Sequence, residues 1–364
     1  MEKHYHYKIL ERTVQDMKRR FKQSNNIPHL HPVTETMIAR NVLVTGGAGY
    51  IGSHTVRELI SNGDNVVVFD DLSCGHAFAV AGINHINGDI GDYELVKKIL
   101  IDNKIDVVVH FAAATLVGES VSDPKKYYEN NIVKGMSLLR AIIDSGVKKI
   151  VFSSSCATYG TPLKVPIDES EKQLPINPYG WTKLMFEQIM KDYDGAYGLK
   201  SVCLRYFNAA GADIKGDIGE KHIPETHVIP LLLHTAMGLR ESFSVFGTDY
   251  DTKDGSCVRD YIHVTDLANA HMKAIDYLLE KNKSDQFNLG TGDGVTVLEL
   301  IDSVERIASV KLNIKKEGRR AGDPAKLVAD NTKARTVLGW VPVHSSIDNI
   351  VKTAWIWHTG AGRQ

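Results

Sequence analysis

The sequence predicts an α/β fold, in which a doubly wound parallel sheet of the Rossmann type is followed by a smaller C-terminal α/β lobe. Three observations support this prediction. Between residues 41 and 206, short apolar runs alternate with longer amphipathic segments. The runs are nearly continuous in Val, Ile and Phe, as expected for strands buried on both faces of a parallel sheet. A glycine-rich turn follows the first run, and the alternation as a whole implies right-handed βαβ units.

The predicted elements follow one another in regular order. The strands are predicted at 41–45, 65–70, 106–111, 149–153 and 201–206. The helices between and after them are predicted near 50–62, 92–103, 124–145 and 178–196. After about residue 210, Gly and Pro become frequent, and shorter candidates follow at 243–246, 260–264, 286–289 and 297–308. We expect these later segments to form the smaller lobe, packed against the carboxyl edge of the sheet where ligands bind in open α/β folds.

Composition excludes several classes of function. The formal net charge of −1 provides no global field that would attract nucleic acid or an anionic membrane. No apolar stretch approaches the roughly 18 residues that a membrane-spanning helix needs. Four scattered cysteines lack the spacing of a metal site or a disulfide framework, and are interpreted as packed, unpaired thiols of a cytoplasmic protein: Cys74, Cys156, Cys203 and Cys257.

The N-terminal segment 1–38 differs from the rest of the chain. It is rich in Lys and Arg but lacks the apolar region of a secretory signal. Met37 lies just before the first apolar run, so it is a candidate start, and the segment 1–38 is predicted to be a poorly ordered arm. A solvated tail is favoured over metal binding for its histidines, and no metal site is expected: His4, His6, His29 and His31.

The segment 45–52 has the features of a dinucleotide-binding turn. Gly46, Gly49 and Gly52 follow an apolar strand and open a helix, where a pyrophosphate can approach the backbone and the helix N-terminus. Asp70 ends the next strand, at the spacing expected for the acidic residue of such a site. A carboxylate there accepts hydrogen bonds from ribose hydroxyls and repels a 2′-phosphate, which favours NAD over NADP. Alone, the glycines are often only a turn, and Asp70 could simply open the turn that follows it; with the glycine turn in place, the ribose role is favoured.

A tyrosine and a lysine lie one helical turn apart, at Tyr179 and Lys183. A positive charge about 4 Å from the phenol contributes on the order of 4 kcal/mol at an effective dielectric of 20, which lowers a pKa of about 10 toward the operating pH before burial opposes it. Tyr179 is therefore a candidate general base, and Ser155 at the end of its strand is a candidate to share the proton. Such pairs are also common on exposed helices, so the interpretation depends on the cofactor turn upstream.

These segments together resemble the extended short-chain dehydrogenase/reductase family and, within it, the UDP-glucose 4-epimerases. The resemblance covers about residues 39 to 358. It rests on the motifs at 45–55, 88–90, 110–113, 117–120, 127–131, 153–160, 178–183, 205–212, 258–266 and 319–324.

The resemblance implies tightly held NAD and a UDP-sugar substrate. Residues expected to contact NAD are Gly46, Gly49, Tyr50, Ile51, Gly52, Asp70, Asp89, Ile90, Phe111, Ala112, Asn131, Tyr179, Lys183 and Tyr206. Residues expected to contact the UDP-sugar are Ser155, Tyr179, Asn208, His227, Val228, Phe246, Arg259, Arg320 and Asp323. The arginines suit a diphosphate because a guanidinium matches its oxygens.

The family mechanism implies an isomerase of galactose metabolism that interconverts UDP-glucose and UDP-galactose. The tyrosine takes the C4 hydroxyl proton while hydride passes to NAD, the 4-keto sugar turns over, and hydride returns to the opposite face. On this basis residues 39–210 are predicted to bind NAD and residues 211–364 mainly the UDP-sugar. A homodimer formed through the helices near 92–103 and 124–145 is also expected.

Two departures from the family pattern and several alternatives stay open. Thr115 stands where many members have a lysine that contacts the cofactor, and Leu327 stands where a tyrosine or a small residue gates N-acetyl sugars. UDP-xylose/UDP-arabinose and UDP-N-acetylhexosamine pairs therefore remain alternatives. A sugar-nucleotide dehydratase is disfavoured because Cys156 and Ala157 replace its acid–base pair, and an NADP-dependent reductase because of Asp70. A catalytically silent nucleotide-binding protein is the remaining alternative.

Overall fold

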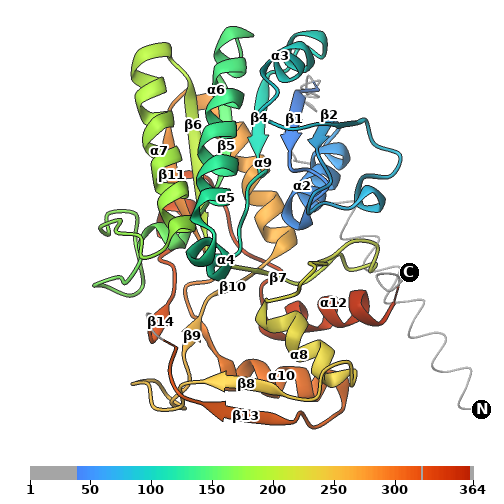
Figure 1. The fold of residues 1–364 in the computed structure, drawn as a ribbon, viewed down its shortest axis with the longest axis vertical. Helices are drawn as coiled ribbons and strands as arrows, with labels where there is room; N and C mark the ends of the chain where they lie inside the picture. Colours follow the sequence, from blue (N-terminus) through green and yellow to red (C-terminus); the bar gives the residue numbers. More distant parts are fainter. Residues whose placement is uncertain (1–38, 321–322, 361–364) are drawn as a thin grey trace, which may run out of the picture. The chain divides into compact units, whose positions relative to one another are not determined.

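The structure is a computed structural model that describes residues 39–320 and 323–360 (Figure 1). The predictions made for residues 1–38, including the arm, Met37 as a start and the four histidines, lie outside the described residues. From Ala39 onward the chain forms one compact unit.

Seven parallel strands form the central sheet, in the spatial order β11-β6-β5-β4-β1-β2-β3. The predicted doubly wound fold is thus confirmed, because strand order reverses on either side of β1. The strands are β1 (Asn41–Thr45), β2 (Asn65–Asp70), β3 (His85–Asn87), β4 (Val107–His110), β5 (Lys149–Ser155), β6 (Lys200–Tyr206) and β11 (Asp285–Leu289). Of these, β3 is too short and polar to have been predicted from its apolar pattern.

Helices cover both faces of this sheet (Figure 1). One apolar core lies between the sheet and the helices α2 (Tyr50–Ser61), α9 (Val264–Lys281) and α11 (Thr332–Val337). The other lies against α3 (Tyr93–Asp102), α6 (Lys134–Asp144) and α7 (Pro178–Tyr197). The strands between these layers are therefore buried on both faces, which explains their nearly continuous apolar sequences.

The segment predicted as one helix over 124–145 consists of three consecutive pieces. These are α5 (Pro124–Tyr128), a π-helical turn η2 (Glu129–Val133) and α6. The remaining short elements are η1 (Ala77–Val80), α4 (Val117–Ser122) and η3 (Cys156–Thr158). A π-turn leaves no mark in apolar periodicity, and such turns often lie at functional sites.

A smaller set of elements follows β6 and is gathered in the lower part of Figure 1. Its apolar core packs around α8 (Val228–Ala236), α10 (Val297–Ala308), α12 (Ile347–Thr359) and β8 (Phe243–Phe246), which pairs with β13 (Ile314–Glu317). Two further small sheets join β7 (Asn208–Ala210) to β10 (Tyr261–His263), and β9 (Val258–Arg259) to β12 (Val295–Thr296) and β14 (Lys326–Leu327).

The expectation that residues 286–289 belong to the smaller lobe is wrong. They lie in β11, which pairs in parallel with β6 at the edge of the central sheet. The sequence of a short apolar strand does not determine which sheet it joins. Here α9 packs in the first core and so returns the chain to the central sheet. The domain boundary at residue 210 therefore stays a prediction.

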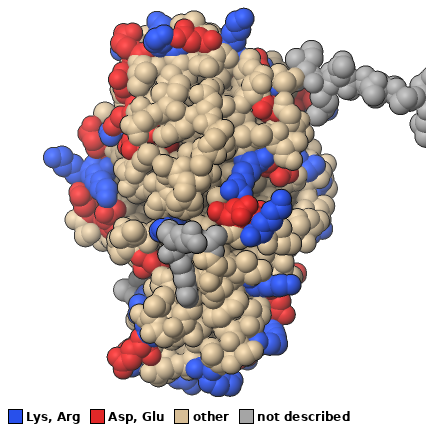
Figure 2. Space-filling model, turned by 90° about the vertical axis from the view of Figure 1, so that its right-hand side faces the viewer, with Lys and Arg blue, Asp and Glu red and all other residues tan. Residues whose placement is uncertain are grey.

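Other features of the surface agree with the sequence. On the face drawn in Figure 2, basic and acidic side chains are interspersed. No helix among the described residues is both long and apolar enough to cross a bilayer. All four cysteines are free; Cys203 and Cys257 are buried as expected, but Cys74 is exposed and does not fill a core.

Candidate active site

A cavity of about 910 Å³ lies at the carboxyl ends of the central strands and extends to the smaller lobe. Most of the residues proposed from the sequence line it: Gly46, Gly49, Tyr50, Ile51, Gly52, Asp70, Asp89, Ile90, Phe111, Ala112, Ser155, Tyr179, Tyr206, Asn208, His227, Val228 and Asp323. The others do not line it: Asn131, Lys183, Phe246, Arg259 and Arg320. The cavity therefore unites the predicted cofactor turn with the predicted substrate residues.

The glycine turn is packed too tightly for larger residues. Gly46 has a φ of +72°, and a Cβ on it would lie 2.5 Å from the backbone nitrogen of Ala112. A Cβ on Gly52 would lie 2.2 Å from the carbonyl oxygen of Gly46. Gly49 is the N-cap of α2 and supplies no side-chain cap, so the first amides of this helix stay available to an anion at the cavity wall.

We expect Gly52→Ala to reduce the amount of NAD that copurifies with the protein at least about tenfold, since the turn must move to relieve the clash with Gly46. The measurement is NAD released per chain after denaturation. Gly195→Ala is the matched control, because a Cβ there meets nothing within 4 Å and alanine favours the helix α7. Equal NAD content in the Gly52 variant and the wild type would contradict the role of this turn.

The Asp70 side chain is held by two backbone amides, one from the glycine turn and one from the segment that follows β2. Its carboxylate oxygens accept hydrogen bonds from the Ala48 amide at 2.9 Å and the Leu72 amide at 2.8 Å. Burial raises the pKa of Asp70. Since a carboxylate has about four acceptor positions, these two bonds leave others for hydroxyl donors within the cavity.

The helix α7 carries Tyr179 to the cavity wall. The Asn177 side chain caps this helix by accepting from the Gly180 amide at 2.8 Å, and Pro178 occupies its first turn. Lys183 is buried one turn further along, where its Nζ donates to the Ser153 carbonyl oxygen at 2.8 Å. The Nζ lies 5.7 Å from the centre of the Tyr179 ring. Since Lys183 does not line the cavity, its charge acts on the phenol from within the protein and not from the cavity side.

The pKa directions differ from the sequence-based argument. Burial raises the pKa of Tyr179, although a hydrogen bond with Ser155 acts in the opposite direction. Burial lowers the pKa of Lys183 to about 7, against the attraction of Glu187. Desolvation, which was expected to oppose the effect of Lys183, is the largest cause acting on each of the two groups. The charge of a bound nicotinamide is the other contribution expected to lower the pKa of Tyr179, so its role as base stays a prediction.

Lys183→Met is expected to change how stability depends on pH. An unfolded lysine titrates near a pKa of about 10.4, whereas burial lowers the folded pKa to about 7. From pH 7 to 10 the unfolded chain thus binds more protons at this residue, so wild-type stability rises with pH by up to about 1.4 kcal/mol per unit. Methionine cannot titrate, so the variant lacks this rise.

The measurement is the melting temperature of both proteins across this pH range. The difference between them should shift in favour of the wild type as pH increases. Lys191→Met removes an exposed lysine from the same helix and is the control. A difference that stays constant with pH would contradict a lowered pKa at Lys183.

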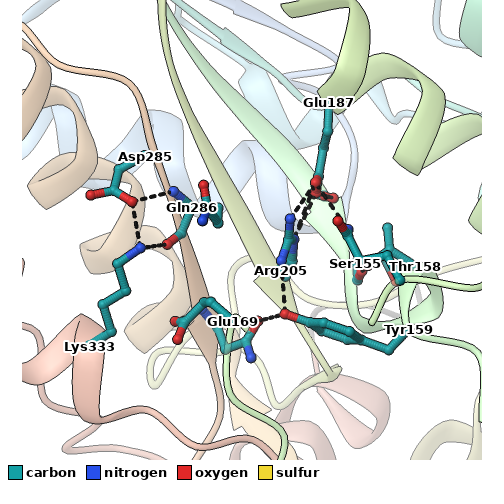
Figure 3. Close-up of polar contacts among 12 residues, drawn as sticks. Ser155, Thr158, Tyr159, Glu169, Glu187, Arg205, Asp285, Gln286 and Lys333 are labelled. Carbon is teal, nitrogen blue, oxygen red and sulfur yellow. Dashed lines mark hydrogen bonds and ion pairs between the residues drawn. The ribbon is translucent and has the colours of Figure 1, made fainter. Parts of the chain in front are cut away.

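A buried ion pair joins Arg205 of β6 to Glu187 of α7, beside Ser154 of β5 (Figure 3). The Arg205 Nη2 donates to a Glu187 oxygen at 2.6 Å, and Nη1 donates to the Tyr159 hydroxyl at 2.9 Å. Ser154 also donates to Glu187, at 2.5 Å. Ser154 thereby connects β5 to this network.

Asn131 in the π-turn uses its amide within the protein. Its Oδ1 accepts from the Ala114 amide at 2.8 Å, and its Nδ2 donates to the Ala114 carbonyl and to Thr182 Oγ1, each at 3.0 Å. It thereby joins the loop after β4 to α7. Its contact with NAD stays a prediction.

The proposed diphosphate-binding residues form two pairs beside the cavity. Arg259 makes an ion pair with Asp323, and the Arg320 guanidinium lies 3.8 Å from the centre of the Phe246 ring. Only Asp323 of these four lines the cavity. Contact of the two arginines with a diphosphate therefore stays a prediction.

The sequence profile of the NAD dependent epimerase/dehydratase family matches residues 42–290. A UDP-glucose 4-epimerase of Rhizobium meliloti (strain 1021) is 55% identical over 320 residues, which cover 88% of this chain and 97% of that protein. The chain belongs to the NAD dependent epimerase/dehydratase family. The resemblance seen in the sequence is thereby confirmed.

Solved structures of this family agree with the fold. The UDP-glucose 4-epimerase of Brucella ovis in complex with NAD has a TM-score of 0.86 and 49% identity, covering 87% of this chain and 98% of that one. The UDP-glucose-4-epimerase of Stenotrophomonas maltophila, with bound NAD and formylated UDP-arabinopyranose, has a TM-score of 0.86 and 40% identity, covering 89% and 99%.

The described residues fit the cofactor after which the epimerase/dehydratase family is named. The Gly46–Gly52 cradle has no space for a Cβ, as a backbone-to-phosphate approach requires, and the Asp70 carboxylate faces the same cavity. Sequence reasoning missed other charged residues that line it: Lys126, Lys134, Glu220 and His222. Lys134 pairs with Asp89 at 2.5 Å, and a contact between residues so far apart in the chain leaves no local signal in the sequence.

Proposed function

We propose that this protein is an isomerase, an NAD-dependent UDP-sugar 4-epimerase that interconverts UDP-glucose and UDP-galactose. The observation that carries the proposal is that one cavity is lined by the glycine turn, by Ser155 and Tyr179, and by residues of the smaller lobe. A UDP-sugar spanning this cavity would bring its sugar to the phenol while its diphosphate lies toward His227 and Asp323.

The chain's own residues would move one proton and hold the sugar. The Tyr179 phenolate takes the proton from the C4 hydroxyl and later returns it, while Ser155, which interacts with the phenol, hydrogen-bonds the same sugar oxygen. When bound, NAD supplies a nicotinamide ring that takes hydride from C4 and returns it, together with a positive charge that lowers the pKa of Tyr179. Lys183 adds its charge from behind the phenol.

The cofactor would stay in place through the cycle. Gly46, Gly49 and Gly52 allow the backbone to approach the pyrophosphate, and Asp70 accepts hydrogen bonds from the adenosine ribose. Since the reaction consumes no net hydride, no added NAD is needed. Thr115 also lines the cavity, and its short side chain makes cofactor retention a quantity to measure.

Sugar preference is proposed as glucose/galactose. Leu327 lies in β14 and lines the cavity together with Asp323 and Pro324. The support for the glucose/galactose pair comes from relatives named UDP-glucose 4-epimerase, which are 44% to 55% identical over most of the chain. Leu327 is intermediate in size between a tyrosine and a small residue, so the sugar panel below tests the N-acetylhexosamine pair.

The test uses purified protein without added NAD and a panel of UDP-sugars: galactose, N-acetylgalactosamine, arabinose and xylose. Products are resolved chromatographically as C4 epimers. We expect UDP-galactose to be converted to UDP-glucose at the highest rate. Absence of conversion for every sugar, also after NAD is supplied, would reject the epimerase proposal, and a faster rate with another sugar would reject the glucose/galactose preference.

We further propose a homodimer that forms through α3 and the α5–α6 segment. Three apolar side chains on these elements are about half exposed: Ile101 at 52%, Val133 at 55% and Met136 at 42%. Burying them against a second copy removes apolar surface from water. Cytoplasmic residence is proposed as well, supported by the four free cysteines.

A further inference from the structure

Two histidines and two glutamates converge in the segment between β7 and α8. Glu220, His222, Glu225 and His227 each offer one ligand atom, and these four atoms lie within 4.8 Å of one another. No other group of three or more His, Cys, Asp or Glu side chains with this geometry is found in residues 39–320 and 323–360. The sequence predicts no metal site, since only its cysteines and N-terminal histidines stand out as candidate ligands.

The distances suit a four-coordinate ion. The Nδ1 of His227 lies 2.8 Å from a Glu220 oxygen and 2.9 Å from a Glu225 oxygen. The Nδ1 of His222 lies 3.3 Å and 3.8 Å from oxygens of the same two carboxylates. Ligand atoms of a tetrahedral ion with bonds of about 2.1 Å lie roughly 3.4 Å apart. The observed separations lie on both sides of that value, so small side-chain shifts would admit an ion.

One ligand atom of the cluster has ion-pair contacts only. The His222 Nδ1 is buried, makes no hydrogen bond with the described residues, and lies 3.3 Å from a Glu220 oxygen and 3.8 Å from a Glu225 oxygen. The side chains of Glu220 and Glu225 are only 6% and 8% exposed. Protonated His222 and His227 can face these two carboxylates as ion pairs, and a divalent ion in place of the two protons would balance the same negative charges.

Residues around the cluster fix its ligands by hydrogen bonds. Two cavities also connect the cluster to solvent. The Glu225 carboxylate accepts from the backbone amides of Thr226 and His227, both at 2.8 Å. The Trp357 indole donates to the Glu220 carbonyl oxygen at 2.8 Å, which fixes the backbone at that end. Glu220 and His222 line both the large cavity and a second cavity of about 220 Å³, so solvent reaches the cluster.

We propose that Glu220, His222, Glu225 and His227 bind a divalent first-row transition-metal ion of the Zn²⁺ class. Imidazole and carboxylate ligands suit this class, and four protein ligands make a closed site of the structural type. The ion fixes the segment 220–227 in front of α8, where Glu220 and His222 line both cavities. The proposal shares His227 with the proposed substrate site, but its tests measure metal binding and not turnover, so the failure of one proposal is distinguishable from the failure of the other.

The first test is equilibrium dialysis of the full, untagged chain against Zn²⁺, followed by metal analysis. We expect one tightly bound ion per chain in the wild type, and affinity at least about tenfold weaker in His222→Asn and in Glu225→Gln. His234→Asn is the matched control: this histidine lines the second cavity but is outside the cluster. Its affinity should stay within about twofold of the wild type.

The variants also separate this site from the four histidines near the N-terminus, which all proteins in the test retain. Unchanged Zn²⁺ affinity in both cluster variants would overturn the proposal. The absence of a tight ion in the wild type would overturn it as well, and would leave the cluster as a set of His–Glu ion pairs.

The second test needs no variant and so does not depend on variant folding. Co²⁺ replaces Zn²⁺ in the wild type, and its visible absorption is recorded. Strong bands of a four-coordinate ion that disappear when Zn²⁺ is added are expected. Weak absorption, as for hydrated six-coordinate Co²⁺, would contradict the proposed ligand set.

Discussion

Tyr179→Phe should lower kcat about 10²- to 10⁴-fold, the usual contribution of a positioned general acid–base group. The phenol of Tyr179 lines the cavity together with Ser155, and phenylalanine removes only its hydroxyl oxygen. UDP and NAD binding should be nearly unchanged, since the ring remains. The fall in kcat would then report the proton transfer alone.

The measurement is kcat and KM for UDP-galactose, with bound NAD determined on the same samples. Tyr277→Phe is the matched control: this buried tyrosine of α9 does not line the cavity, and its hydroxyl donates to Asp285 at 3.1 Å. That variant should lose about 1 kcal/mol of stability and keep its turnover within about twofold. Near-native kcat in Tyr179→Phe would reject this residue as the base.

Structural features that depend only on residues close together in the chain were predictable from the sequence. The parallel sheet followed from apolar runs such as 65–70, and the turn at Gly46–Gly52 followed from its place between a strand and a helix. The pairing of Tyr179 with Lys183 needed only helical geometry. Each of these is local, so periodicity and spacing carry the information.

Features that depend on burial or on distant partners were not predictable. The joining of β11 to β6 depends on where α9 packs, and the raised pKa of Tyr179 depends on how completely the fold excludes water from it. The cluster at 220–227 is local in sequence, but its convergence requires a loop whose backbone is held by Trp357. Arg205 and Glu187 belong to different elements and meet only because β6 and α7 pack together.

Arg205→Met is expected to destabilise the protein by about 3–5 kcal/mol, because it leaves the Glu187 carboxylate buried without its cation. The two side chains are only 5% and 8% exposed, and the pair connects α7 to β6. The Tyr159 hydroxyl also loses its guanidinium partner. Thermal melting should show a decrease on the order of 10 °C.

Arg306→Met is the matched control for this prediction. Arg306 also pairs with a carboxylate, that of Asp348, but both side chains are more than half exposed. Its replacement should therefore cost no more than about 1 kcal/mol. Equal melting temperatures for the two variants would mean that the buried pair contributes no more than a surface pair.

The double variant Glu187→Gln/Arg205→Met separates an unpaired charge from lost packing. If Arg205→Met destabilises the protein mainly because the Glu187 carboxylate is left without a cation, the neutral glutamine amide at position 187 should restore at least half of the decrease in melting temperature. Ser154 can still donate to the amide oxygen, so the bond from β5 is retained. No recovery would show that the guanidinium acts through its packing and its bond to Tyr159. Recovery would show that Glu187, one turn from Lys183, tolerates its burial only because Arg205 balances its charge.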